Sequence, residues 1–244
     1  MTLAGFEITR SSFFSTHYAS PSDALGARMR LRTEPTFPLL VGRARRFTSL
    51  VTQLHIEVCG AVTSRSEPGL PTVFATCHGE IQTADALIAD LYASKVVSSA
   101  RFALSVHNTA SGQYAVATGN TEPSTTITGA NAVAAGWLEA VLIALESGKP
   151  TLLSVADEPV PKVFRGPAVV EGVAAAFVVA PLSGRGRRAE IAMTPSPRGG
   201  EAAPETVRTL AQVADSTMHG RAEVIRLGPI RPGSSLELHV GAMP

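Results

Sequence analysis

The sequence predicts an α/β fold with one mixed, mostly five-stranded sheet, helices on both of its faces and a short β-rich tail. One observation is a strand at 123–128 that leads through a tight turn into a helix at 132–147, apolar nearly all round, and then into a strand at 151–156. Another is the β-branched run at 71–77, which an amphipathic helix follows. The third is the apolar run at 169–182, whose lack of polar alternation suits a strand covered on both faces.

The composition indicates a buried core and a protein interface. Hydrophobic residues make up 45% of the 244 residues and charged residues only 17%, which is more apolar surface than a monomer needs. The net charge of +1 argues against a partner bound through bulk electrostatics, such as nucleic acid. No apolar run is long enough to span a membrane, and the N-terminus carries no basic-then-apolar signal pattern. The two cysteines, Cys59 and Cys77, fit a reduced cytoplasmic protein.

The first part of the chain contains a short strand at 5–10, an irregular stretch at 11–37 and a helix at 38–62. Arg43, Arg45 and Arg46 lie in the first turns of that helix, where the helix dipole disfavours cations. Two interpretations remain open. The arginines form a solvated basic face, or they form a docking site for an acidic carrier or for another subunit.

The middle of the chain alternates strands and helices. After a linker at 64–71 and the strand at 71–77, a helix is expected to turn Ile81, Ala84, Leu87, Ile88 and Leu91 inward. A short apolar segment at 98–106 and a helix of small residues ending near Thr118 follow. Gly148 closes the apolar helix at 132–147, in the position where helices often end.

The last part of the chain contains the β-rich tail. A basic turn at 183–188 separates the strand at 169–182 from a strand at 189–194. A Pro- and Gly-rich linker at 195–204 leads into a helix at 204–215. Two final strands are expected at 222–227 and 234–240, with a connection at 229–233.

Several common catalytic and binding motifs are absent. The sequence has no Gly-x-Ser-x-Gly elbow, no His-Glu-x-x-His and no Cys-x-x-Cys pair. The six histidines show no metal spacing, so neither a metal nor a cofactor is expected. Cys77 and His78 are neighbours after a strand and therefore point to opposite faces, which favours a buried structural cysteine over a thiolate–imidazolium pair.

A resemblance emerges from the order and spacing of several segments. Residues 102–108, Gly112, Pro123-Ser124 and the turn at 128–131 resemble the N-terminal half of β-ketoacyl synthases of the thiolase fold. Further similar segments extend the likeness from about Arg43 to Thr194. The resemblance implies a single truncated domain over 1–244, with its core at about 38–194, corresponding to half a thiolase-like domain.

The resemblance also identifies two departures from an active synthase. The family places its acyl-accepting cysteine at the start of the buried helix, and that position falls on Asn131 here. An amide cannot be acylated as a thiolate is, whereas Asn is a strong helix N-cap, which is the plainer interpretation of Asn131. The catalytic histidines and lysine of the family's second half have no counterpart, because His219 and His239 lie in no such motif.

The implied function is that of a non-catalytic, chain-length-factor-like partner of a full-length β-ketoacyl synthase. Such a subunit forms a heterodimer with the synthase, and an acyl carrier protein delivers substrate to that heterodimer. The subunit forms part of the wall of the acyl pocket in aryl polyene or xanthomonadin-type pigment synthesis. Five residues are the candidates for the partner interface and acyl tunnel: Phe102, Leu104, Val106, Asn108 and Thr128. Ordinary core packing is the alternative for the first three.

Two other functions remain open. One is an acyltransferase or thioesterase that uses Cys77 or Ser124 on a remodelled site. The other is a self-associating structural module without acyl chemistry.

Overall fold

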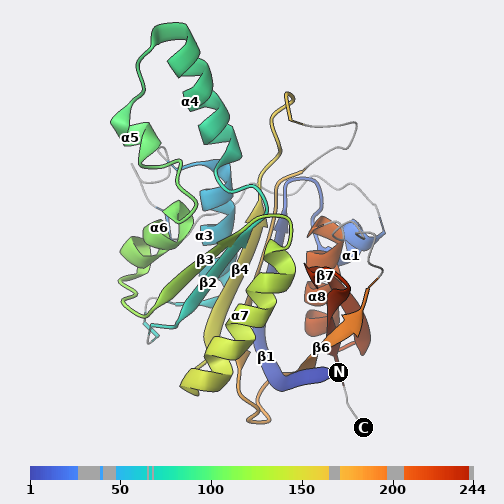
Figure 1. Cartoon of the computed structure of the whole chain (residues 1–244). Coiled ribbons are helices and arrows are strands. Elements are labelled where there is room, and N and C mark those ends of the chain that lie inside the picture. The colour runs from blue at the N-terminus through green and yellow to red at the C-terminus, as the bar shows by residue number, and fades with distance from the viewer. Residues whose placement is uncertain are drawn as a thin grey trace.

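The computed structural model describes residues 1–26, 39–40, 48–64, 66–67, 69–164, 171–196 and 206–241 (Figure 1). The strands are β1 (Thr2–Ser15), β2 (Thr72–Thr76), β3 (Ser124–Thr128), β4 (Thr151–Asp157), β5 (Val173–Ala180), β6 (Arg187–Pro195), β7 (Glu223–Arg231) and β8 (Ser234–Val240). The helices are α1 (Pro21–Leu25), α3 (Leu50–Val62), α4 (Ile81–Ser94), α5 (Ser99–Phe102), α6 (Thr109–Thr118), α7 (Ala132–Ser147) and α8 (Thr206–His219).

The described strands form one mixed sheet in the order β3-β2-β4-β5-β1-β6-β8-β7. β2 runs parallel to β3 and β4, and the other neighbours pair antiparallel. The predicted α/β class is confirmed, but the sheet has eight strands rather than mostly five. The strand count was wrong because the second edge of β1 pairs with β6, with Gly5 opposite Glu190, so the predicted tail continues the same sheet.

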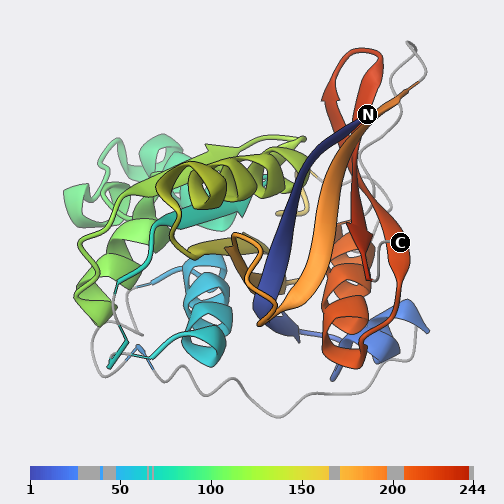
Figure 2. The ribbon, with the colours of Figure 1, turned by 90° about the horizontal axis from the view of Figure 1, so that it is seen from below.

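Helices cover both faces of the sheet (Figure 2). α7 and α8 pack on one face, where Trp137, Phe6 and Phe177 belong to the larger apolar cluster. α3 and α6 pack on the other face against a second cluster that includes Phe74. The far edge strand β7 contacts both α7 and α8, so the sheet curls toward their side. Every residue of β2, β4 and β5 is buried, as expected for strands covered on both faces.

Several predicted boundaries were wrong. β1 extends to Ser15, and α1 follows at Pro21–Leu25, so the stretch at 11–37 is not irregular throughout. The helix predicted at 38–62 is described from Leu50, where the Ser49 hydroxyl accepts a hydrogen bond from the Thr52 amide. The predicted connection at 229–233 lies partly within β7, which tolerates Pro229 because it is an edge strand.

Two helices are less buried than their sequences suggested. α4 rises away from the sheet beside α5 (Figure 1), and Leu87 is its only buried residue. Ile88 and Leu91, which were expected to face inward, are 49% and 46% exposed. On α7, Leu142 and Leu145 lie on an exposed side of a helix that looked apolar all round. None of the described helices has both the length and the hydropathy of a membrane span.

Candidate functional site

The parallel strands place the candidate nucleophile position, Asn131, at the side of the sheet where their carboxyl ends lie. Because β2, β3 and β4 are parallel, their carboxyl ends meet there, and the turn after β3 leads into the N-terminus of α7. Gly129 adopts φ 110° in this turn, a conformation that a side chain would strain. Its amide donates to the Thr76 carbonyl at 3.2 Å and so ties the turn to β2.

Asn131 occupies the N-cap position of α7, but its side chain does not cap the helix. Its carbonyl accepts a hydrogen bond from the Ala135 amide at 2.9 Å, and its carboxamide makes no capping hydrogen bond. The residue is exposed. The interpretation of Asn131 as a side-chain cap was therefore wrong: its φ of −100° and ψ of 11° differ from the extended backbone of a typical N-cap.

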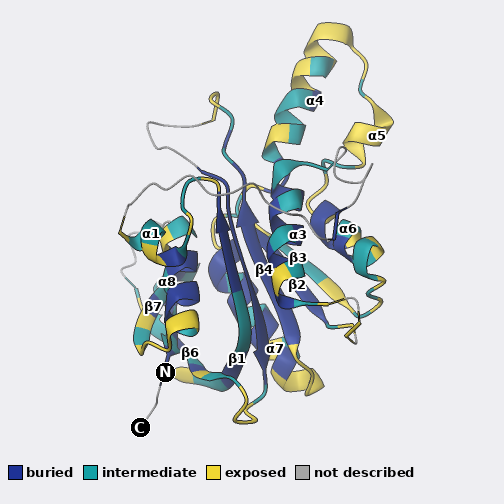
Figure 3. Ribbon diagram, turned by 180° about the vertical axis from the view of Figure 1, so that it is seen from behind, coloured by how far each residue is buried: buried dark blue, intermediate teal, exposed yellow. Residues whose placement is uncertain are grey.

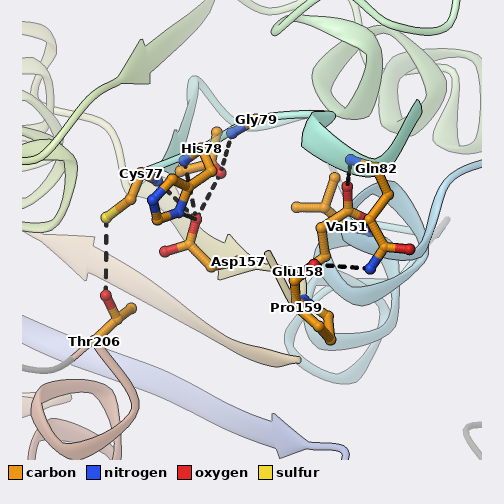
Figure 4. Close-up of polar contacts among 10 residues, drawn as sticks. Val51, Cys77, His78, Gly79, Gln82, Asp157, Glu158, Pro159 and Thr206 are labelled. Atoms are coloured by element: carbon orange, nitrogen blue, oxygen red, sulfur yellow. Dashed lines mark hydrogen bonds and ion pairs between the residues drawn. The ribbon is translucent and has the colours of Figure 1, made fainter. Parts of the chain in front are cut away.

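Cys77 is held beside a carboxylate at the end of β2 (Figure 4). Burial, and next the negative charge of Asp157, raise the pKa of the Cys77 thiol to about 12. Asp157 accepts hydrogen bonds from the amides of Cys77 and His78, while the thiol lies 3.8 Å from Thr206 Oγ1. These surroundings suppress the thiolate, so they support the structural interpretation of Cys77 and disfavour its use as a nucleophile.

Ser124 has no catalytic surroundings in the described part of the chain. It is an exposed residue at the beginning of β3, the amino end of the strand, whereas Asn131 follows the carboxyl end. No hydrogen bond joins its hydroxyl to a histidine or carboxylate within the described ranges. A serine nucleophile needs an adjacent base, so Ser124 is a weak candidate for acyl transfer.

A buried carboxylate joins the two helices that begin at this edge. Glu158 follows β4 and accepts hydrogen bonds from the amides of Val51, in α3, and Gln82, in α4, at 3.2 and 2.9 Å (Figure 4). Burial raises the pKa of Glu158 to about 7, although these amides lower it, and the nearby Glu80 and Asp157 raise it further. Glu158 thus anchors the base of α4.

This anchor predicts a pH-dependent stability. The pKa of Glu158 rises from 4.5 to about 7 on folding, so the native state binds more protons between these values. We expect the Glu158 contribution to be complete below pH 4.5 and to fall by about 3 kcal/mol as the pH rises past 7. Urea unfolding of the wild type and of a variant without this carboxyl group, between pH 5 and pH 8, measures this change as the difference between the two proteins.

The Glu158→Gln variant tests the assignment. Its amide cannot titrate, so we expect the stability of the wild type relative to Glu158→Gln to fall by about 3 kcal/mol between pH 5 and pH 8, while Glu146→Gln, at an exposed position on α7, keeps the wild-type slope. An unchanged slope in Glu158→Gln would contradict the assignment. Burial lowers the pKa of His55 from 6.5 to about 3, so its contribution acts in the opposite sense up to pH 6.5 and is common to the wild type and the variant. Glu7, whose pKa is lowered to about 2, also acts in the opposite sense but only below pH 4.5, outside this window.

The predicted interface residues lie on an open apolar surface, which we call the arm face. It consists of exposed side chains on α4, on α5, in the connection between them and in the loop after α5: Ile88, Leu91, Tyr92, Val96, Phe102 and Val106. Phe102 is 60% exposed and Val106 is 38% exposed, which rules out core packing within this chain for both, while Leu104 is half-buried. Figure 3 shows α5 and much of α4 in the colour of exposed residues.

The other predicted site residues are separated or not described. Asn108 is exposed at the N-terminus of α6, and Thr128 is exposed at the end of β3. β3 is an edge strand with no residue fully buried, and the Ser111 hydroxyl of α6 lies 3.3 Å from that of Thr126 in its middle. Arg43, Arg45 and Arg46 lie outside the described residues. Sequence reasoning missed Tyr92, although it lies on a helix whose apolar stripe was visible.

Comparison with family models identifies one family, and comparison with solved structures shows the fold. A model described as the beta-ketoacyl synthase, N-terminal domain, matches residues 27–226. No curated protein matches the sequence. Among solved structures, a chain of the ketosynthase in complex with its chain length factor from Xenorhabdus doucetiae matches with a TM-score of 0.73 and 16% identity, covering 97% of this chain and 100% of that one.

Two further structures share the fold at lower identity. A chain of the ishigamide ketosynthase/chain length factor matches with a TM-score of 0.69 and 11% identity, covering 99% of this chain and 100% of that one. A chain of a type II PKS acyl-carrier protein in complex with its ketosynthase matches with a TM-score of 0.70 and 11% identity, covering 100% of both. The family model covers most of the sequence, so this chain belongs to the family of beta-ketoacyl synthase N-terminal domains.

Proposed function

We propose that this protein is a non-catalytic, chain-length-factor-like partner of a full-length β-ketoacyl synthase. The observation that carries the proposal is Asn131 at the start of α7, where the family resemblance places the acyl-accepting cysteine. A ketosynthase needs a thiolate at that point, and a carboxamide cannot supply one. Cys77 cannot replace it easily, because its pKa of about 12 keeps the thiol protonated.

The exposed surfaces support a role in a complex. The arm face and the edge strand β3 leave apolar side chains and strand backbone open to a partner. Structures that share the fold include a ketosynthase with its chain length factor and an acyl-carrier protein with its ketosynthase. A partner seated on the arm face would bury Phe102 and Val106, which this chain leaves exposed.

Each predicted site residue has a place in this proposal. Phe102, Leu104 and Val106 form part of the wall of an acyl pocket shared with the synthase, with Asn108 and Thr128 at the same interface. Arg43, Arg45 and Arg46 form a docking site for an acidic acyl carrier protein. The chain acts as one domain, and the pathway makes an aryl polyene or related polyketide.

Covalent labelling tests the proposal. The chain is purified together with its partner synthase and incubated with malonyl- and acyl-carrier thioesters, and the adducts are located by mass spectrometry. We expect adducts on the synthase cysteine alone and no thioester turnover by this chain without the synthase. Turnover by the isolated chain, or an adduct on Cys77 or Ser124, would refute the proposal in favour of an acyltransferase or thioesterase.

Two controls complete this experiment. A synthase whose nucleophilic cysteine is replaced by alanine is expected to lose all labelling in the complex. The Cys77→Ala variant of this chain is expected to leave the labelling unchanged, because the proposal gives Cys77 no chemical role. Light scattering addresses self-association: a homo-oligomer that excludes the synthase would favour a purely structural module.

A further inference from the structure

We propose that a groove lined by arginines, remote from the arm face, binds a phosphate-ester anion. The groove, with a volume of about 560 Å³, lies between the middle of β1, the turn before β6 and the C-terminal end of α8. Arg10, Arg185 and Arg187 line it together with the hydroxyl residues Thr9 and Ser11, and no carboxylate is among its lining residues. We call it the arginine groove. The proposal does not depend on the proposed function.

A buried carboxylate holds the turn that carries two of these arginines. The side chain of Glu7 accepts hydrogen bonds from the amides of Ser183, Gly184, Arg185 and Gly186 and from the Ser183 hydroxyl. Burial alone would raise the pKa of Glu7, but these hydrogen bonds lower it to about 2, so the carboxylate stays ionised. The basic turn is therefore fixed by its backbone, and its arginines are not needed to neutralise Glu7.

A bulge in β1 and the C-terminal end of α8 also shape the groove. The register of β1 against β5 shifts between Ile8 and Arg10, and such a bulge re-aims the side chains beside it. α8 ends at the groove, where the Arg187 guanidinium donates to the Gly220 carbonyl. This contact offsets the negative end of the α8 dipole, which would otherwise repel an anion. β1 contacts both β6 and α8, and the three elements are labelled in Figure 3.

The positive charge of the groove is only partly compensated. Arg10 pairs with Glu67 at 2.6 Å, but Arg185 has no ion-pair partner among the described residues. The nearest acid on α8, Asp215, is buried and already contacts Arg221 and His219 at 2.7 and 3.1 Å. The whole chain has a net charge of only +1, so three arginines around one hollow, with Arg185 left without an ion pair in the described part of the chain, are a local departure from that balance.

Phosphate is the anion that fits this chemistry. Guanidinium groups bind phosphate oxygens through paired, charge-assisted hydrogen bonds. The Ser11 hydroxyl adds a further donor, whereas the Thr9 hydroxyl already donates to the Val178 carbonyl at 3.1 Å. A volume of about 560 Å³ exceeds inorganic phosphate and lies in the usual range of small-molecule sites. Two sources carry such a group: a free nucleotide, or the phosphopantetheine arm of a carrier. The experiment separates them.

Isothermal titration calorimetry of the full chain with inorganic pyrophosphate tests the site. We expect binding that Arg185→Ala weakens about tenfold and Arg185→Lys weakens less, because lysine keeps the charge but loses the paired donors. Arg188→Ala is the matched control: Arg188 has the same charge and lies three residues further along, in β6, but it does not line the groove. We expect it to change the affinity by less than about twofold.

The same titrations with ADP and with 4′-phosphopantetheine identify the source. Tighter binding of ADP assigns the groove to a nucleotide, and tighter binding of 4′-phosphopantetheine assigns it to a carrier arm. Equal affinities mean that the groove recognises the phosphate alone, which also supports the proposal. No pyrophosphate binding at about 10 mM, or equal losses in Arg185→Ala and Arg188→Ala, would overturn it. All of these outcomes are independent of the synthase labelling.

Discussion

Replacement of Phe102 by aspartate is expected to weaken binding of the partner synthase about 100-fold. Phe102 is 60% exposed on the arm face, so it is available as an aromatic anchor for an interface. A carboxylate there would have to be buried without a partner when the complex forms. The free chain should unfold within about 0.5 kcal/mol of the wild type, because the side chain is already in solvent. Surface plasmon resonance and urea unfolding measure the two quantities.

Val224→Asp is the matched control for this prediction. Val224 is 59% exposed on β7, at the end of the sheet opposite β3, and it is not part of the arm face. We expect this variant to bind the synthase as the wild type does. If Phe102→Asp also binds normally, the arm face is not the interface; equal weakening by both variants would point to a general effect of added charge.

The strands that sequence reasoning located well are those whose burial is uniform. β2, β4 and β5 are apolar along their whole length because helices cover both faces, and such runs are visible without any alignment. β1 was located only in part. Its bulge between Ile8 and Arg10 changes the alternation, so Phe6 and Phe13 join the same apolar cluster although their positions differ by an odd number, seven.

The total extent of the sheet was not predictable from local patterns. Each strand of the tail was recognised, yet nothing in its sequence states which existing edge it joins. The pairing of β6 with the free edge of β1 decides this, and it depends on contacts between residues almost two hundred positions apart, such as Thr2 and Ala192. A tail and an extended sheet have the same local sequence signal.

The candidate site shows a similar division. The position of Asn131 at the start of a helix was foreseen, because small residues and Gly129 mark the turn. The absence of a capping hydrogen bond from its side chain was not foreseen, because capping depends on backbone angles that the sequence does not fix. The apolar stripe of α4 was also visible, but an apolar stripe predicts burial without saying in which chain. Ile88 and Leu91 illustrate this, because they face solvent here.

The largest loss of stability is expected for Trp137→Ala. Trp137 is fully buried in α7, with its ring centroid 4.9 Å from that of Phe177 and 6.2 Å from that of Phe6. Removing the ring leaves a cavity between the helix and the sheet, at a cost of about 4 kcal/mol in the free energy of unfolding. The midpoint of urea denaturation measures it.

Two further variants separate the cavity from other effects. The indole Nε1 of Trp137 has no hydrogen-bond partner within the described residues, so Trp137→Phe removes an unsatisfied donor while it keeps an aromatic ring. We expect it to cost about 2 kcal/mol, half as much as the alanine variant. Leu142→Ala, at a 50% exposed position on the same helix, should cost about 0.5 kcal/mol. Equal losses in Trp137→Ala and Leu142→Ala would mean that α7 is not held to the sheet by its buried face, and the placement of Asn131 at the sheet edge would fail with it.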